Sequence, residues 1–146
     1  MRVGLANGCF DLLHEGHLYF LAEASKHCDY LIVAVNSDRS VARLKGADRP
    51  VQDLATRMYE IQAQASPWVD AIIKFDGSVD RLVMAIRPDV VIKGYDHGNE
   101  QFMAMHVPGW KEGANAMDIV TVVRIAHLPG YSTSLQLAMA KAKTSA

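Results

Sequence analysis

Residues 30-YLIVAVN-36 form a nearly continuous apolar run that is rich in β-branched side chains. Such a run is typical of a strand that is buried on both faces, as in a parallel sheet covered by helices. Outward from this run, similar short apolar stretches predict further strands at 2–7, 70–75, 89–94 and 118–125. The chain is therefore expected to contain several strands of the buried kind.

The segments between these strands have helical spacing or a polar, irregular composition. Helices are predicted at 17–28, at the start of 37–53, at 53–66, at 78–88 and at 132–143. The residues expected to cap or end them are Asp53, Ser78, Pro88 and either Ser132 or Thr133. The segment 95–117 is expected to be irregular.

Strands that alternate with helices in this way predict an α/β fold. The expected architecture is a Rossmann-like three-layer sandwich, with a central parallel sheet and helices on both faces. The crossovers of such a sheet are right-handed. A length of 146 residues fits a single domain spanning 1–146, and no internal repeat or linker interrupts it.

The composition excludes several classes of function. Apolar residues make up 50% and charged residues 21%, which is typical of a soluble domain with a core. The net charge of -1 gives no basic footprint for nucleic acid. No apolar run reaches the roughly 18 residues that cross a bilayer, and no signal peptide is recognised. With only two cysteines, a reducing compartment is indicated. We therefore expect a cytoplasmic protein with no nucleic-acid or membrane partner.

The stretch 7-NGCFDLLHEGH-17 follows the first predicted strand and leads into the first helix. In a parallel sheet, ligands bind at this edge, near the point where the strand order reverses. A helix N-terminus attracts phosphate through its unpaired N–H groups and its dipole. Gly8 and Gly16 allow close backbone approach, and His14 and His17 are spaced to face one anion. The stretch matches neither the dinucleotide fingerprint nor the P-loop.

Each candidate residue also has a purely structural interpretation. Two histidines at a helix start are often solvated or capping, and Asp11 is suited to fix the turn through backbone N–H groups. Asp38 is suited to cap a helix N-terminus. Arg57 is suited to lie on a solvated face of a helix, and Lys45 is suited to lie at the protein surface. Cys9 is expected to be a small buried residue and not a nucleophile.

A metal site is not supported by the second group of histidines. His97 and His106, with Asp96 and Glu100, fit no standard zinc spacing.

The stretch 8-GCFDLLHEGH-17 resembles the G-x-F-D-x-x-H-x-G-H signature of the nucleotidyltransferase (cytidylyltransferase-like) superfamily. Further matches follow in order, over nearly the whole chain except about 97–117: 35-VNSD-38, 44-LKG-46, 49-RPV-51, 57-RM-58, 68-WVD-70, 88-PDVVIKGYD-96 and 130-GYSTS-134. This run is similar to the adenylyltransferase domain of ADP-heptose synthases. The glycerol-3-phosphate cytidylyltransferases share the first motif and a similar Ser-Thr turn near the end.

The resemblance implies nucleotidyl transfer. A sugar or polyol phosphate would attack the α-phosphorus of a nucleoside triphosphate and pyrophosphate would leave, with catalysis by positioning and charge neutralisation. His14 and His17 are implied to contact the triphosphate, where they would tend to stay protonated. Lys45 is implied to bridge the phosphates of both substrates. Mg²⁺ carried by the triphosphate is the implied cofactor, and a homodimer is expected.

The same resemblance implies the remaining site residues. The late Ser-Thr turn would hold phosphate oxygens, and Gly94 and Asp96 would approach the base and the ribose. Asp38 and Arg57 would support the substrate site. The full set implied to bind the nucleotide is Asn7, Gly8, Cys9, Phe10, Asp11, Gly16, Lys93, Gly94, Asp96, Tyr131, Ser132 and Thr133.

Departures from the family pattern leave the substrates open. Tyr95 stands where the heptose relatives usually carry a glycine, and Leu135 and Gln136 stand where the cytidylyltransferases carry basic residues. One hypothesis is an adenylyltransferase that forms an ADP-sugar from ATP and a heptose 1-phosphate-like acceptor. Another is a cytidylyltransferase that uses CTP and a polyol phosphate such as glycerol 3-phosphate. The third is a nucleotide-binding module without turnover, against which the intact histidine pair and Lys45 argue.

Overall fold

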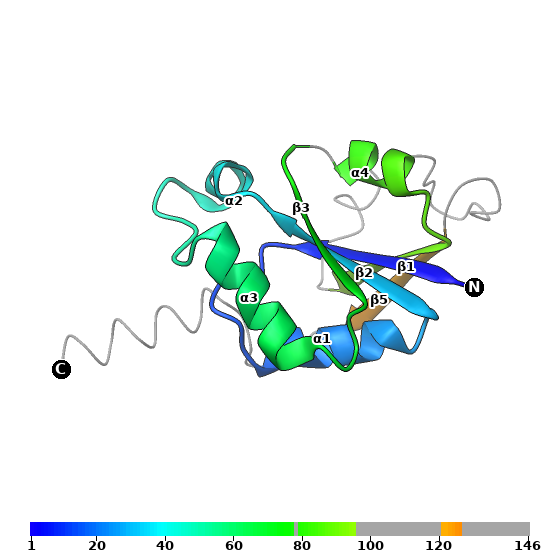
Figure 1. Cartoon of the computed structure of the whole chain (residues 1–146). Helices are drawn as coiled ribbons and strands as arrows, with labels where there is room; N and C mark the ends of the chain where they lie inside the picture. The colour runs from blue at the N-terminus through cyan, green and yellow to red at the C-terminus, as the bar shows by residue number, and fades with distance from the viewer. Residues whose placement is uncertain (78, 96–120, 127–146) are drawn as a thin grey trace.

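Figure 1 shows a computed structural model of the chain, which describes residues 1–77, 79–95 and 121–126. Within these residues a five-stranded parallel sheet has the order β3-β2-β1-β4-β5. The strands are β1 (Val3–Gly8), β2 (Tyr30–Asn36), β3 (Ala71–Phe75), β4 (Val90–Tyr95) and β5 (Thr121–Ala126). The helices are α1 (Glu15–Ser25), α2 (Asp38–Lys45), α3 (Leu54–Ala65) and α4 (Val79–Ile86).

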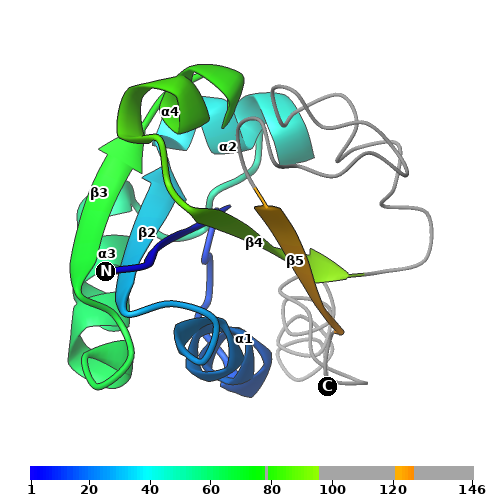
Figure 2. The same cartoon turned by 90° about the vertical axis from the view of Figure 1, so that its right-hand side faces the viewer.

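Helices cover both faces of the sheet, with α1 and α3 on one side and α2 and α4 on the other (Figures 1 and 2). The strand β2 shows why its sequence is apolar throughout. Val33 and Val35 pack into the core on the α1 and α3 side, and Ala34 packs into the core on the α4 side. All three are fully buried. The predicted three-layer α/β sandwich is confirmed.

The strand order creates a switch point at the middle of the sheet. The strand β1 is central and pairs with β2 on one side and β4 on the other, so that Ala6 lies opposite both Val33 and Ile92. The chain runs outward from β1 to β3, then crosses to β4 and β5. The carboxyl ends of β1 and β4 therefore border the position where ligands bind in this class of fold.

The predicted element boundaries differ from the observed ones at a few places. The helix α1 begins at Glu15, earlier than predicted, because His14 serves as its N-cap, and it ends at Ser25. The N-cap of α2 is Ser37, so the interpretation of Asp38 as an N-cap is wrong. Asp53 caps α3 as predicted. The proposed cap Ser78, the helix at 132–143 and nearly all of the segment 95–117 lie outside the described residues.

Within the described part of the chain, no helix combines the length and the apolar character needed to cross a membrane.

Candidate functional site

The turn between β1 and α1 is backbone-strained and tightly packed. Phe10 and Leu12 have φ values of 50° and 54°, in the left-handed region that side chains other than glycine rarely adopt. A Cβ on Gly8 would lie 3.0 Å from the Phe10 ring, so glycine lets that ring pack against the strand end. Strain of this kind often occurs at functional sites, because the surrounding structure must hold it in place.

His14 and His17 form a capping box built from imidazoles. The His14 Nδ1 accepts a hydrogen bond from the Gly16 amide at 3.0 Å, and the His17 Nδ1 accepts one from the His14 amide at 3.2 Å. The two rings stack with centroids 3.9 Å apart. Because both Nδ1 atoms act as acceptors, the ring proton of each neutral imidazole lies on Nε2. Capping therefore leaves each histidine with a donor that points away from the backbone.

The surroundings of His14 favour the neutral imidazole. Burial lowers the pKa of His14 below its usual 6.5. A neutral His14 still donates from Nε2, so it suits an anion site at neutral pH. The expectation that the histidines stay protonated concerns the triphosphate complex and stays a prediction, because the charge of a triphosphate would act against the effect of burial.

The Asp11 carboxylate ties the turn to the loop before α3. It accepts hydrogen bonds from the amides of Val51 at 2.8 Å and Gln52 at 3.0 Å, and from the Arg49 Nε at 3.1 Å. Gln52 in turn accepts from the Leu12 amide through its Oε1. Burial by itself raises the pKa of Asp11, but these hydrogen bonds outweigh it and lower the pKa. Asp11 therefore connects this turn to a loop that is distant in sequence. The predicted contact of Asp11 with nucleotide stays a prediction.

Arg57 is fully buried behind the turn, so the interpretation of a solvated helix arginine is wrong. Its Nη1 donates to the carbonyl oxygens of Cys9 at 2.7 Å and Asn36 at 2.8 Å. Its Nε donates to the carbonyl oxygen of Gln52, and its Nη2 donates to Asp38 Oδ1 at 2.7 Å. One guanidinium thus connects the ends of β1 and β2 with the loop before α3, and it supports the site without facing it.

Lys93 lies at the end of β4, on the other side of the switch point. It is 6% exposed and donates to the Asn7 side-chain oxygen at the end of β1. Burial lowers the pKa of Lys93 to about 8. Two residues that sequence reasoning assigned to the nucleotide are thereby in direct contact across neighbouring strands.

Cys9 and Lys45 lie on the β2 side of the turn. The Cys9 thiol is half-buried beside the Asn36 side chain, and burial raises its pKa more than the charges of Lys45, Arg57 and Arg49 lower it. Cys9 is therefore a thiol at neutral pH, and the expectation that it is not a nucleophile stays a prediction. Lys45 is the exposed last residue of α2, and its contact with phosphate stays a prediction.

Most of the predicted site residues meet at this edge of the sheet. They are Asn7, Gly8, Cys9, Phe10, Asp11, His14, Gly16, His17, Asp38, Arg57, Lys93 and Gly94. Asp96, Tyr131, Ser132 and Thr133 lie outside the described residues. Among the residues that are described, no group of three or more His, Cys, Asp or Glu side chains is placed to hold a metal ion.

Sequence reasoning missed Arg49 and Gln52, which connect their loop to Asp11 and Leu12. The only signal for Arg49 was its place in the matching stretch 49-RPV-51, and that match gave it no role.

Residues 5–142 match the family model described as cytidylyltransferase-like. The chain belongs to this family. It is 42% identical over 134 residues to the bifunctional protein HldE of Acidiphilium cryptum, and 47% identical over 103 residues to that of Histophilus somni. These alignments cover 91% and 70% of this chain but only 26% and 21% of the relatives. The chain thus spans about a quarter of the length of these relatives.

Solved structures show the same fold. The lipopolysaccharide core biosynthesis protein of Thermoplasma volcanium is 31% identical with a TM-score of 0.69, and the match covers 88% of this chain and 98% of that one. The pantoate-β-alanine ligase of Francisella tularensis has a TM-score of 0.59 at 12% identity, covering 91% of this chain and 61% of that one. This second likeness concerns the fold alone.

Proposed function

We propose that this chain is a nucleotidyltransferase that transfers AMP from ATP to a heptose 1-phosphate-like sugar phosphate, forming an ADP-sugar and pyrophosphate. The observation that carries the proposal is the histidine pair at the switch point. Both imidazoles keep Nε2 as a donor at the N-terminus of α1, where backbone N–H groups and the helix dipole also favour phosphate.

The chemistry requires positioning more than proton transfer. A phosphate oxygen of the acceptor would form a bond to the α-phosphorus while the bond from that phosphorus to pyrophosphate breaks. Negative charge collects on the oxygens around the α-phosphorus and on the leaving group. Donors from His14, His17 and the first amides of α1 would stabilise this charge, and Lys45 would add a mobile cation. Mg²⁺ would arrive on the triphosphate and keep several of its waters.

The nucleotide would bind on the β4 side of the turn. Asn7, Lys93 and Gly94 line that side at the ends of β1 and β4, and Asp96 is proposed to reach the ribose. Tyr131, Ser132 and Thr133 are proposed to hold the outer phosphates. The homodimer expected from the resemblance stays a prediction, which the mass of the protein in solution would check.

Two similarities support a sugar phosphate as the acceptor. HldE proteins are among the relatives that are similar to this chain in sequence, and one similar chain of known structure is a lipopolysaccharide core biosynthesis protein. The family description favours a second candidate, in which CTP and a polyol phosphate such as glycerol 3-phosphate are the substrates.

Pyrophosphate release tests the proposal. The protein with Mg²⁺ would be supplied with ATP, CTP, GTP or UTP, each with heptose 1-phosphate or with glycerol 3-phosphate. We expect release with ATP and heptose 1-phosphate. Release only with CTP and glycerol 3-phosphate would move the chain to the second candidate. Binding of nucleotide without any release would indicate a module that has lost turnover.

A further inference from the structure

Arg49 is a buried cation, and its ion pair with Asp11 leaves one of its N–H groups without an acceptor among the described residues. The residue is 8% exposed, and its Nε donates to Asp11 Oδ2. Its Nη2 is buried and finds no hydrogen-bond acceptor within the described part of the chain. Burying a guanidinium N–H group without an acceptor costs free energy, because the group loses its water. Because this cost lowers stability, a buried donor without an acceptor suggests that a ligand supplies the acceptor.

Asp11 does not supply the missing acceptor. Its Oδ1 already accepts from the Gln52 amide, and its Oδ2 accepts from the Val51 amide as well as from Arg49. The carboxylate is thus engaged by its own loop contacts and meets Arg49 through one nitrogen. Asp11 therefore holds the guanidinium through Nε, and Nη2 has no acceptor among the described residues.

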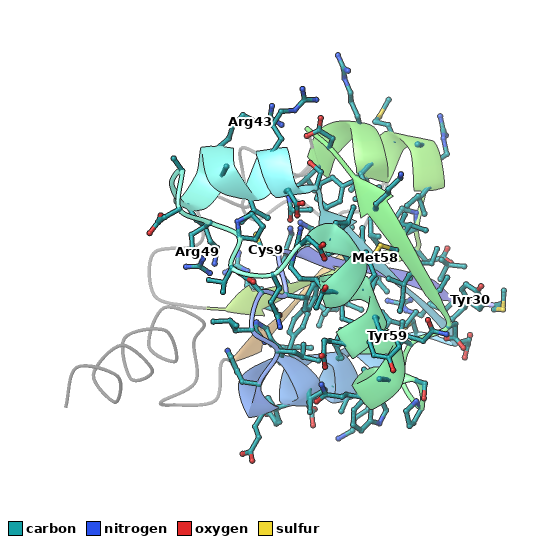
Figure 3. The ribbon with its side chains drawn as sticks, turned by 60° about the vertical axis from the view of Figure 1, so that its left-hand side comes forward. Cys9, Tyr30, Arg43, Arg49, Met58 and Tyr59 are labelled. Carbon is teal, nitrogen blue, oxygen red and sulfur yellow. The ribbon has the colours of Figure 1, made fainter. Side chains whose placement is uncertain are left out.

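Arg49 lies beside the turn between β1 and α1. Figure 3 shows it in the loop that follows α2, next to Cys9 at the start of the turn. The hydrogen bond to Asp11 agrees with this view, and the charge of Arg49 lies near enough to lower the pKa of the Cys9 thiol. The loop joins α2 to α3, and both helices contact β2, which is the neighbour of β1 on the side opposite to β4. If the nucleotide occupies the β4 side, this is the side from which the second substrate meets the α-phosphorus.

We propose that the Nη2 of Arg49 binds the phosphate group of the acceptor sugar phosphate. The inference rests on the proposed function, because the proposed function places the nucleotide on the β4 side of the site. An acceptor phosphate is a dianion that must approach a triphosphate, so it needs a donor that offsets the repulsion. A guanidinium held by a carboxylate is suited to this, since its planar nitrogens stay charged at every working pH and point in fixed directions. The contact orients the attacking oxygen without itself touching the α-phosphorus.

Steady-state kinetics of pyrophosphate release test this assignment. Arg49→Lys keeps a cation that is able to pair with Asp11 but has one nitrogen only, and Arg49→Gln removes the charge. We expect both variants to raise the KM for heptose 1-phosphate about tenfold or more, and to leave the KM for ATP within about twofold. Arg43→Lys and Arg43→Gln are the matched controls. Arg43 lies on α2, is exposed, and pairs with Asp76, so these controls should leave both KM values unchanged.

Several results would overturn the assignment. An Arg49→Lys variant with an unchanged KM for the acceptor would mean that the pair with Asp11 alone accounts for this arginine. A rise in the KM for ATP instead would assign the nitrogen to the triphosphate. If both Arg49 variants unfolded, the buried pair would be a requirement of the fold and the inference would fall.

Failure of the proposed function can be told apart from failure of this inference. A wild-type protein that releases no pyrophosphate would contradict the function itself. In that case, binding of phosphate by Arg49 would be tested by the rise in melting temperature that inorganic phosphate causes in the presence of α,β-methylene-ATP. We expect a clear rise in the wild type and a smaller one in Arg49→Lys, and equal rises would contradict the inference.

Discussion

His14 and His17 each use Nδ1 to hold the first turn of α1, so the ring proton of each neutral imidazole lies on Nε2. This division explains how one residue type serves as a helix cap and as an anion donor. A serine or aspartate cap would satisfy the same backbone amide, but it would not present a second donor on the far side of its ring.

Replacing His17 separates these two roles. We expect His17→Ala to lower kcat by about a hundredfold or more, because one donor to developing charge is worth roughly 3 kcal/mol. Loss of the cap should lower the unfolding free energy by only about 1 kcal/mol. The measurement is the kcat for pyrophosphate release together with a urea unfolding curve. The matched control is His27→Ala, which removes an exposed histidine just beyond α1. Wild-type kcat in a stably folded His17→Ala protein would sink the assignment.

Lys93 gives a pH dependence whose sign follows from its burial. Its pKa is about 8 in the folded protein, below the ordinary 10.5 that applies to the unfolded chain. Between these two values the unfolded chain binds more protons, so the unfolding free energy rises as the pH rises from about 8 to 10.5. We expect the wild type to gain about 3 kcal/mol relative to Lys93→Met over this range. Urea unfolding at pH 7.5, 9 and 10.5 measures the difference, and parallel curves for the two proteins would refute it.

At the scale of elements, the site depends on a loop that is distant in sequence. Residues of the loop 49–52 donate hydrogen bonds to Asp11 in the turn after β1, and Arg57 at the start of α3 donates to Cys9 in the same turn. These contacts join residues that are 38 to 48 positions apart. The strained φ values of Phe10 and Leu12 persist because this second layer fixes the turn from behind.

Removal of Arg57 should therefore affect both stability and rate. We expect Arg57→Met to lower the unfolding free energy by about 3 to 5 kcal/mol, because it leaves the carbonyl oxygens of Cys9 and Asn36 without their donor. The KM for ATP should rise as the turn loosens. Arg39→Met, which removes an exposed arginine from an ion pair with Asp76, should leave both quantities unchanged. A fully stable and active Arg57→Met protein would show that the turn holds itself.

The elements themselves were predictable, and their connections were not. The period of the apolar residues in 30–36 and in 53–66 reports burial on two faces or one, and this is a local property. The histidine pair was also found locally, because a motif and a helix start coincide there. The partners of Asp11, Arg49 and Arg57 depend on how distant loops meet, and no local pattern records this. For the same reason, the structural alternative for Asp38, a helix N-cap, was wrong, since its carboxylate pairs with Arg57.

At the scale of the whole molecule, the strand order decides where the chemistry takes place. The switch point between β1 and β4 brings together the histidine turn, the Lys93 and Asn7 pair, and the loop that carries Arg49. Donors thus surround one edge of the sheet from both sides of β1. This arrangement suits two phosphate-bearing substrates that meet over the N-terminus of α1, one from the β4 side and one from the β2 side.

The proposed reaction requires attack on the α-phosphorus, and phosphorus NMR of a reaction mixture shows which phosphorus is attacked. The protein would be incubated with ATP, Mg²⁺ and heptose 1-phosphate until the spectrum stops changing. We expect the two coupled resonances of a diphosphate that joins adenosine to the sugar, together with free pyrophosphate. Resonances of ADP and of a sugar carrying a second phosphate would show transfer of the γ-phosphate instead, and would contradict nucleotidyl transfer.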